Sequence, residues 1–243
     1  MNVVDSAVGR IVIPPDLPPG FALFYTTRDL LGRLDDVTVS DLMDVIRLQF
    51  GVEAVLTTCT QVHGATVRHA VPGNAWRECG SCDALWSSDA RTALGIKVAD
   101  CLPVTMIDPA HSVIANVHSG WRGVVQRITS ETIATIERET AFDPGTSLAY
   151  LGPSIRGCCF EVGEEVVEQL AHAYGDIARY VDRTKAKPHV DLVAITADVL
   201  RAAGFAEDAV LDSGLCTRCE GSMFHSYRRD AKSGGRNLAF VAQ

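Results

Sequence analysis

Three residues with metal-binding side chains each stand at the end of an apolar run. His63 precedes a glycine in QVHG, Cys101 follows an acid in ADC, and His118 precedes a glycine turn in NVHSG. Two imidazoles and one thiolate are a suitable three-ligand set for Zn²⁺, and they leave a fourth position for water or substrate. Because a structural zinc site usually fills all four positions, this set indicates a catalytic centre. Zinc with an open position lowers the pKa of bound water to about 7.

The spacing of these residues means that the fold must bring them together. His63 and Cys101 are 38 residues apart and Cys101 and His118 are 17 apart, which is too long for a local zinc motif. Taken alone, such residues at strand ends are more often packing residues than ligands. The turn HSGWRG also carries Trp121 and Arg122, a flat apolar surface and a permanent cation, beside the histidine.

Strands and helices are mixed along the chain without a regular βαβ rhythm, which predicts one α+β or layered α/β domain over residues 1–243. An irregular, proline-rich lead is expected over 13–20. Apolar runs predict strands, and helical spacing of apolar residues predicts helices. The expected strands cover 21–28, 52–70 with a break near Gly64, 95–108 in two runs, 112–120 and 147–155. The expected helices cover 38–50, 124–140, 164–175 and 190–205, and a hairpin-like region ends the chain.

Composition and charge narrow the class of protein. The 243 residues are 47% hydrophobic and 21% charged, as in a packed globular chain. A net charge of −8 argues against non-specific binding to nucleic acid or to anionic lipid, because both need a positive surface. No apolar run approaches the roughly 20 residues that cross a membrane, and the N-terminal residues lack a secretion signal. We therefore expect a cytoplasmic protein whose eight cysteines are reduced.

Several motifs together resemble one known family. QVHG, ADCLPV, HSGWRG, LGPSIRGCCFEVG, FHSYRRD and GGRN occur in this order from about residue 21 to the end. The chain is identified by them as a member of the laccase-domain family, also named multicopper polyphenol oxidase and purine nucleoside phosphorylase. The resemblance implies zinc binding by His63, Cys101 and His118, which would also be the catalytic residues. It also implies a layered α/β/β/α sandwich similar to the cytotoxic-necrotising-factor-like cysteine hydrolase fold, in a monomer or homodimer.

The same resemblance implies activity on purine nucleosides. Phosphorolysis of adenosine, inosine or methylthioadenosine would use inorganic phosphate as co-substrate, and deamination would convert adenosine to inosine. Such an enzyme would be both a transferase and a hydrolase. A guanidinium fork matches phosphate oxygens, so candidate phosphate ligands are Arg28, Arg122, Arg228 and Arg229. Trp121 or Phe224 would stack on the purine. Asp100, beside Cys101, would either orient a ligand histidine or cap a turn.

Other functions remain open at this point. A multicopper oxidase uses a His-Cys-His sequence to bridge its copper centres, whereas this chain has seven histidines and no such sequence. A single copper in the zinc site would give weak polyphenol oxidase activity, because Cu²⁺ outcompetes Zn²⁺ at nitrogen-rich sites. Alternatively, Cys101 as nucleophile and His118 as base would make a cysteine hydrolase or amidase. The family resemblance implies that such an enzyme would edit peptidoglycan precursors. A non-enzymatic scaffold is the third class.

Two CxxC pairs raise a separate possibility. CGSC (79–82) and CTRC (216–219) would form a structural Cys₄ zinc site if the fold brought them together, and otherwise they are reduced, buried thiols. The adjacent pair Cys158 and Cys159 is expected to serve packing.

Overall fold

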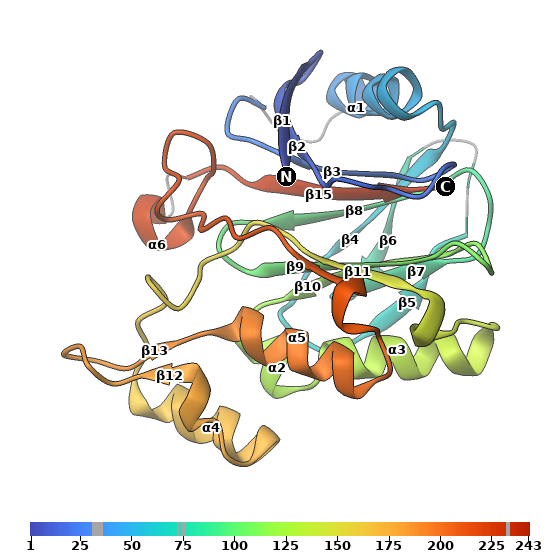
Figure 1. Ribbon diagram of the computed structural model, residues 1–243. Coiled ribbons are helices and arrows are strands. Elements are labelled where there is room, and N and C mark those ends of the chain that lie inside the picture. The colour runs from blue at the N-terminus through green and yellow to red at the C-terminus, as the bar shows by residue number, and fades with distance from the viewer. Residues whose placement is uncertain (31–35, 72, 74–75, 232–233) are drawn as a thin grey trace.

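Two β-sheets packed face to face form the centre of the molecule (Figure 1). This computed structural model describes residues 1–30, 36–71, 73, 76–231 and 234–243. Among them, the first sheet has seven strands in the order β1-β2-β3-β15-β8-β4-β6 and the second has six in the order β14-β11-β9-β10-β7-β5. A short pair, β12-β13, stands apart from both sheets.

The strands of the first sheet, in sheet order, are β1 (Asn2–Ser6), β2 (Gly9–Ile13), β3 (Ala22–Thr26), β15 (Asn237–Ala242), β8 (Thr92–Val98), β4 (Val55–Thr60) and β6 (Arg77–Ser81). Those of the second are β14 (Val210–Asp212), β11 (Leu148–Leu151), β9 (Leu102–Asp108), β10 (Val113–Ser119), β7 (Ala84–Ser87) and β5 (Val67–His69). The small pair is β12 (Val181–Asp182) and β13 (His189–Val190). The α-helices are α1 (Asp36–Phe50), α2 (Trp121–Val125), α3 (Ile128–Glu139), α4 (Glu164–Tyr174), α5 (Leu192–Ala202) and α6 (Tyr227–Asp230).

Helices cover the outer face of each sheet. Because side chains alternate along a strand, Leu23 of β3 points into the core between the sheets while Phe24 points outward against α1. The outer face of the second sheet packs on α3 and α5. The layers therefore run helix, sheet, sheet, helix, as Figure 1 shows from α1 at the top to α3 and α5 below. The mixed α+β class is as expected, and a closer likeness to cysteine hydrolases stays a prediction.

Burial on both sides explains why β9 and β10 are almost continuously apolar. Every residue of both strands is buried, and they pair antiparallel from Val113–Asp108 to Ser119–Leu102. Asn116 is one of three polar residues in β10, and its side-chain amide donates to the carbonyls of Leu94 and Ala239 in the first sheet, over 3.0 and 2.9 Å. These two bonds tie the sheets together beneath the end of β10.

The structure corrects two expected elements. The helix predicted over 124–140 is divided into α2 and α3, because Arg127 adopts a left-handed conformation with φ 60° between them. The prediction of a hairpin-like region at the end of the chain is also wrong. The C-terminal strand β15 is an interior strand that pairs antiparallel with β3 and β8. The irregular lead over 13–20 follows a hairpin, β1 and β2, that the sequence pattern did not indicate. Among the described residues, none of the helices has the length and apolar character needed to span a membrane.

Candidate metal centre

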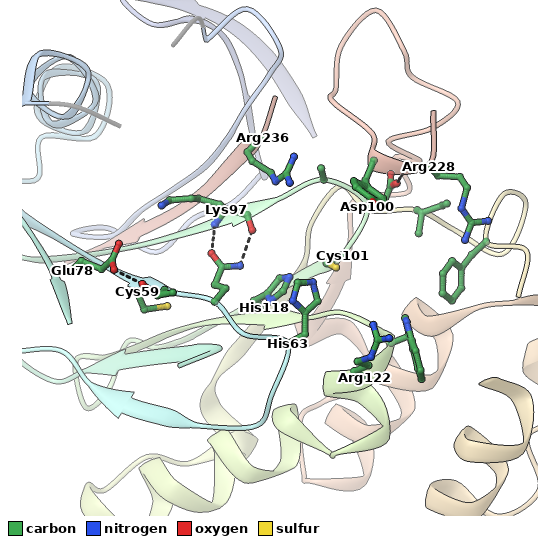
Figure 2. A pocket seen from close by; sticks show the side chains of 17 residues that line it. Cys59, His63, Glu78, Lys97, Asp100, Cys101, His118, Arg122, Arg228 and Arg236 are labelled. Carbon is green, nitrogen blue, oxygen red and sulfur yellow. Dashed lines mark hydrogen bonds between the residues drawn. The ribbon is translucent and has the colours of Figure 1, made fainter. Parts of the chain in front are cut away.

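His63, Cys101 and His118 come together from three different elements. His63 follows β4, Cys101 lies in the turn between β8 and β9, and His118 is near the end of β10. One ligand atom from each lies within 4.8 Å of the others, so the group could hold a metal ion. The two imidazole rings meet edge to face, with centroids 4.8 Å apart and planes at 82°. Figure 2 shows both rings beside the sulfur of Cys101.

Asp83 holds this group in place, although no local sequence motif indicates this role. Its carboxylate is fully buried and accepts a hydrogen bond from Nδ1 of His118 over 2.8 Å. It also accepts from the backbone N–H groups of Val62, His63 and Gly64 over 3.2, 2.9 and 2.7 Å. These three donors explain how His63 keeps a left-handed φ of 60°. With Nδ1 of His118 bonded to Asp83, Nε2 is left as its ligand atom.

The charges of the group favour a thiolate beside the imidazoles. Burial would raise the pKa of the Cys101 thiol, but hydrogen bonds and charge interactions with His118 and His63 lower it to about 7. Burial would lower the pKa of His118, but its bonds to Asp83 and Cys101 raise it to about 9. Burial likewise opposes ionisation of Asp83, yet the hydrogen bonds from His118, Gly64 and His63 hold its pKa below the ordinary value. The thiolate is the form of cysteine that binds metals.

Gly120 provides the space that the Cys101 sulfur occupies. Its backbone, at φ −71° and ψ 170°, suits any residue. A Cβ there would lie 2.8 Å from Sγ of Cys101 and 3.6 Å from Cδ2 of His63. The glycine before WRG is therefore required by packing against a proposed ligand, and not by backbone conformation.

The replacement Gly120→Ala should consequently weaken metal binding about 10–100-fold, because the added methyl group must push Cys101 Sγ away from the histidines. Zinc affinity measured by competition with a coloured chelator checks this. The matched control is Gly123→Ala, whose methyl group would meet a methyl carbon of Ile128 at 3.1 Å and the backbone carbonyls of His118 and Gly64 at 3.5 and 3.6 Å, but none of the proposed ligand atoms. If both variants bind zinc as the unsubstituted chain does, the space at Gly120 has no role in the site.

A cavity of about 740 Å³ opens over the three residues. Four cationic side chains line it, from Lys97, Arg122, Arg228 and Arg236. In Figure 2, Lys97 and Arg236 lie on one side of the histidines and Arg122 lies on the other. This volume is within the usual range for small-molecule sites.

Aromatic surfaces lie on the same wall as two of the cations. The Arg122 guanidinium carbon stands 4.4 Å from the ring centroid of Trp121, and that of Arg228 stands 5.6 Å from the ring of Phe160. Trp121 and Arg122 open helix α2 directly after Gly120, so the end of β10 delivers both to the cavity. Phe160, Lys97 and Arg236 were missed from the sequence, because only the fold shows that these residues reach the cavity.

Three residues that the sequence suggested for substrate binding lie elsewhere. Phe224 is fully buried in the core between the sheets and is not among the residues that line the cavity. Arg28 also lies outside the lining, where it donates to the carbonyl of Gly221. Arg229 donates to the carbonyls of Thr217, Arg218 and Phe224 and pairs with Asp230, so its side chain braces the C-terminal loops.

Asp100 connects the site to the C-terminal segment. It has a left-handed φ of 84°, and its carboxylate accepts from the hydroxyl of Thr217 and from the backbone N–H of Arg228, both over 2.6 Å. These two hydrogen bonds fit the turn-capping alternative, and Asp83 is the carboxylate that bonds to a proposed ligand histidine.

The two CxxC pairs do not meet, so they do not form the shared Cys₄ site that was one of the two alternatives. The Cys79 and Cys82 thiols interact with each other, and the Cys82 thiol also interacts with Cys59, whose own thiol donates to the carbonyl of Cys82. Cys216 and Cys219 instead lie against Cys158 and Cys159. Among the described residues, this second group also has the spacing to hold a metal ion.

Comparisons with known proteins agree with the motifs. A family model described as multi-copper polyphenol oxidoreductase laccase matches residues 35–243. The chain is 38% identical over 161 residues to adenosine deaminase RL5 from an unknown prokaryotic organism, which is 65% of this chain and 61% of that protein. It is 31% identical over 160 residues to purine nucleoside phosphorylase YlmD of Bacillus subtilis, which is 65% of this chain and 58% of that protein. These matches span about three fifths of either relative's length.

A solved structure extends the likeness over nearly the whole chain. The crystal structure of YlmD from Geobacillus stearothermophilus has a TM-score of 0.79 and 26% sequence identity, and the match covers 93% of this chain and 94% of that one.

Proposed function

Because the chain belongs to the multi-copper polyphenol oxidoreductase laccase family, we propose that it is a zinc-dependent enzyme of purine nucleosides. The proposed reactions are phosphorolysis of adenosine, inosine and methylthioadenosine, and deamination of adenosine. Relatives named purine nucleoside phosphorylase and adenosine deaminase support this choice. The observation that carries it is the convergence of His63, Cys101 and His118 beneath a cavity lined by cations and aromatic rings.

The donor set fits zinc. Two imidazoles and one thiolate are ligands that Zn²⁺ takes readily, and three protein ligands leave one position open. The hydrogen bond of Asp83 to His118 is the outer contact that orients zinc-bound histidines. Bound zinc would supply a Lewis acid that polarises a substrate oxygen or activates water. Copper in the same place is the alternative that the family description suggests, and metal analysis separates the two.

The cations of the cavity would bind phosphate. Arg122 and Arg236 can each offer a planar pair of donors to two oxygens of one anion, while Lys97 would act as a point charge. In phosphorolysis a phosphate oxygen forms a bond to the anomeric carbon of the ribose, and the bond from that carbon to the purine nitrogen breaks. The purine leaves with the electron pair of the broken bond and takes up a proton. Trp121 and Phe160 provide apolar surfaces on which the base would stack.

Product analysis tests the proposal directly. The purified chain is incubated with adenosine, with and without inorganic phosphate, and the products are separated by chromatography. We expect adenine and ribose 1-phosphate only when phosphate is present, and inosine in either case. A chelator should stop both reactions, and added zinc should restore them. A chain with stoichiometric metal that turns over none of the three nucleosides would overturn the proposal.

Removing one cation of the cavity should distinguish phosphate binding from the chemistry that depends on the metal alone. Arg122→Ala should raise the KM for phosphate about tenfold or more, because a charge-assisted hydrogen bond of this kind is worth about 1.5–3 kcal/mol. Deamination does not use phosphate and should change less. The matched control is Arg138→Ala, an exposed arginine of α3 outside the cavity lining. An equal loss of both activities would show that Arg122 is not a phosphate ligand.

One observation favours a second candidate, a cysteine hydrolase. Cys101, His118 and Asp83 form a thiol, imidazole and carboxylate series, with the thiol pKa lowered to about 7. A thiolate bound to a metal is a poor free nucleophile, so the two functions compete for one sulfur. Alkylation of Cys101 by iodoacetamide, followed by peptide mass spectrometry, distinguishes them. Protection by zinc supports the metal site, whereas equal labelling with and without zinc, together with turnover of a peptide amide, supports the hydrolase.

A further inference from the structure

Four cysteines converge in a second place, apart from the three proposed ligands. Cys158 and Cys159 lie in the segment between β11 and α4, and Cys216 and Cys219 lie in the segment between β14 and α6 (Figure 1). The four Sγ atoms all lie within 4.8 Å of one another. Sγ of Cys219 is 3.8 Å from that of Cys158 and 3.4 Å from that of Cys159, and all four thiols are free.

The backbone builds this cluster from two paired turns. Ser154 and Cys216 form a parallel bridge, in which Ser154 N donates to Leu215 and Thr217 N donates to the carbonyl of Ser154, over 3.3 and 3.0 Å. Each turn then closes on itself. Phe160 N donates to the carbonyl of Arg156 over 2.8 Å, and Glu220 N donates to that of Cys216 over 2.9 Å. The sulfurs therefore meet because the main chain holds both turns in register.

The sulfur distances match a tetrahedral ion better than a disulfide. Four Zn–S bonds of about 2.3 Å in a tetrahedron place the sulfurs about 3.8 Å apart, inside the observed spread. A disulfide needs about 2.05 Å. Cys159 and Cys216 are buried, 8% and 5% exposed, whereas Cys158 and Cys219 are exposed and provide an entry path for an ion.

The four thiols differ in their electrostatic surroundings. Burial and contacts with the other thiols raise the pKa of Cys158, and contacts with Cys159 and Cys216 raise that of Cys219 to about 11. Burial alone would raise the pKa of Cys216, but the backbone N–H groups of Cys219, Arg156 and Arg218 lower it below its ordinary value. The Arg218 side chain interacts with Cys159, and the charge of Arg156 acts on Cys158. Four thiolates around a divalent cation carry a net charge of −2, and Arg218 would offset part of it, because the Arg156 guanidinium is already paired with Asp212.

We propose that Cys158, Cys159, Cys216 and Cys219 bind one zinc ion as a closed, structural site. This proposal does not rest on the proposed enzymatic activity. It would join the turn that carries Ile155 and Phe160, which line the cavity, to the turn that precedes α6 and Arg228. Thr217, between the two C-terminal cysteines, bonds to Asp100 beside Cys101, so the ion would also fix the wall behind the first site.

Cobalt and zinc binding to the full-length chain, purified under reducing conditions, test this. The background variant is Cys101→Ser, which removes the thiolate of the first site. Cobalt titration should saturate at one ion per chain with the intense visible and near-ultraviolet bands of tetrahedral thiolate coordination. Zinc should displace the cobalt and raise the Tm by about 5–10 °C.

Adding Cys216→Ser to this background should abolish the tetrathiolate spectrum and the zinc-dependent shift in Tm. If that buried substitution prevents folding, Cys219→Ser, at an exposed position, should have the same spectral effect. The matched control, Cys79→Ser in the same background, should keep both signals. Lack of cobalt uptake by the Cys101→Ser chain, a spectrum unchanged by Cys216→Ser or Cys219→Ser, or a disulfide within the cluster under reducing conditions would each overturn the proposal. Each of these outcomes leaves the test of nucleoside turnover unaffected.

Discussion

Replacing His118 by alanine should remove the metal of the first site and lower nucleoside turnover by about a thousandfold or more. His118 is 3% exposed and supplies one of the three proposed ligand atoms, so its loss would leave His63 and Cys101 of the set. The activation that a bound metal provides is worth several kcal/mol, and each 1.36 kcal/mol is a factor of ten in rate. Metal content by mass spectrometry and kcat/KM for adenosine are the two measurements.

Two further variants make this result interpretable. Cys101→Ser keeps the size of the side chain and should lose metal and activity to the same extent, which excludes a cavity at His118 as the cause. His172→Ala, an exposed histidine on α4, should keep both. If His118→Ala retains metal at this site and turns over adenosine normally, the assignment of His118 as a ligand fails.

Asp83→Asn should have the second largest effect. Each carboxylate oxygen of Asp83 accepts two hydrogen bonds, and an amide would turn one of these oxygens into a donor that faces other donors. Each buried group left without a partner costs about 1–3 kcal/mol, so the free energy of unfolding should fall by about 2–5 kcal/mol. Metal affinity should fall about 10–100-fold, because His118 loses the contact that orients it. Urea unfolding and zinc competition measure the two effects.

The lowered pKa of Asp83 predicts how the stability difference between the unsubstituted chain and Asp83→Asn depends on pH. A carboxyl group whose pKa is lower in the folded chain stabilises the fold at pH values above its ordinary pKa, 3.8. That contribution is lost as the pH falls through the lowered value. The stability gap between the two chains should therefore be full at neutral pH and shrink in acid. Asp89→Asn, which breaks the exposed pair of Asp89 and His69, is the matched control and should change stability by less than about 1 kcal/mol. A gap that is equally small for both variants would contradict the role of Asp83.

The proposed ligands could be predicted because each stands where an apolar run ends. A residue at the end of a buried strand lies where the strand leaves its sheet. Several strand ends can meet in space, but the sequence alone does not show which of them meet. Asp83 could not be predicted in this way. It is separated from His118 by 35 positions and from His63 by 20, and it follows a CxxC motif that draws attention to sulfur chemistry.

The C-terminal motif shows a different limit. FHSYRRD suggested one aromatic and two cationic groups for the substrate, but only Arg228 of the three lines the cavity. Consecutive residues of the short helix α6 point in different directions, so Arg229 turns toward the loops that it braces. The four-cysteine cluster was missed for a similar reason. Its two pairs are joined by the bridge between Ser154 and Cys216, a contact that neither pair signals locally.

Anomalous diffraction at the zinc absorption edge, from crystals grown with zinc, tests the central claim most directly. We expect a peak within about 2.5 Å of a ring nitrogen of His63, a ring nitrogen of His118 and Sγ of Cys101. Density with no peak between these three residues, or with an ion bonded to only one of them, would contradict the metal site on which the proposed function rests.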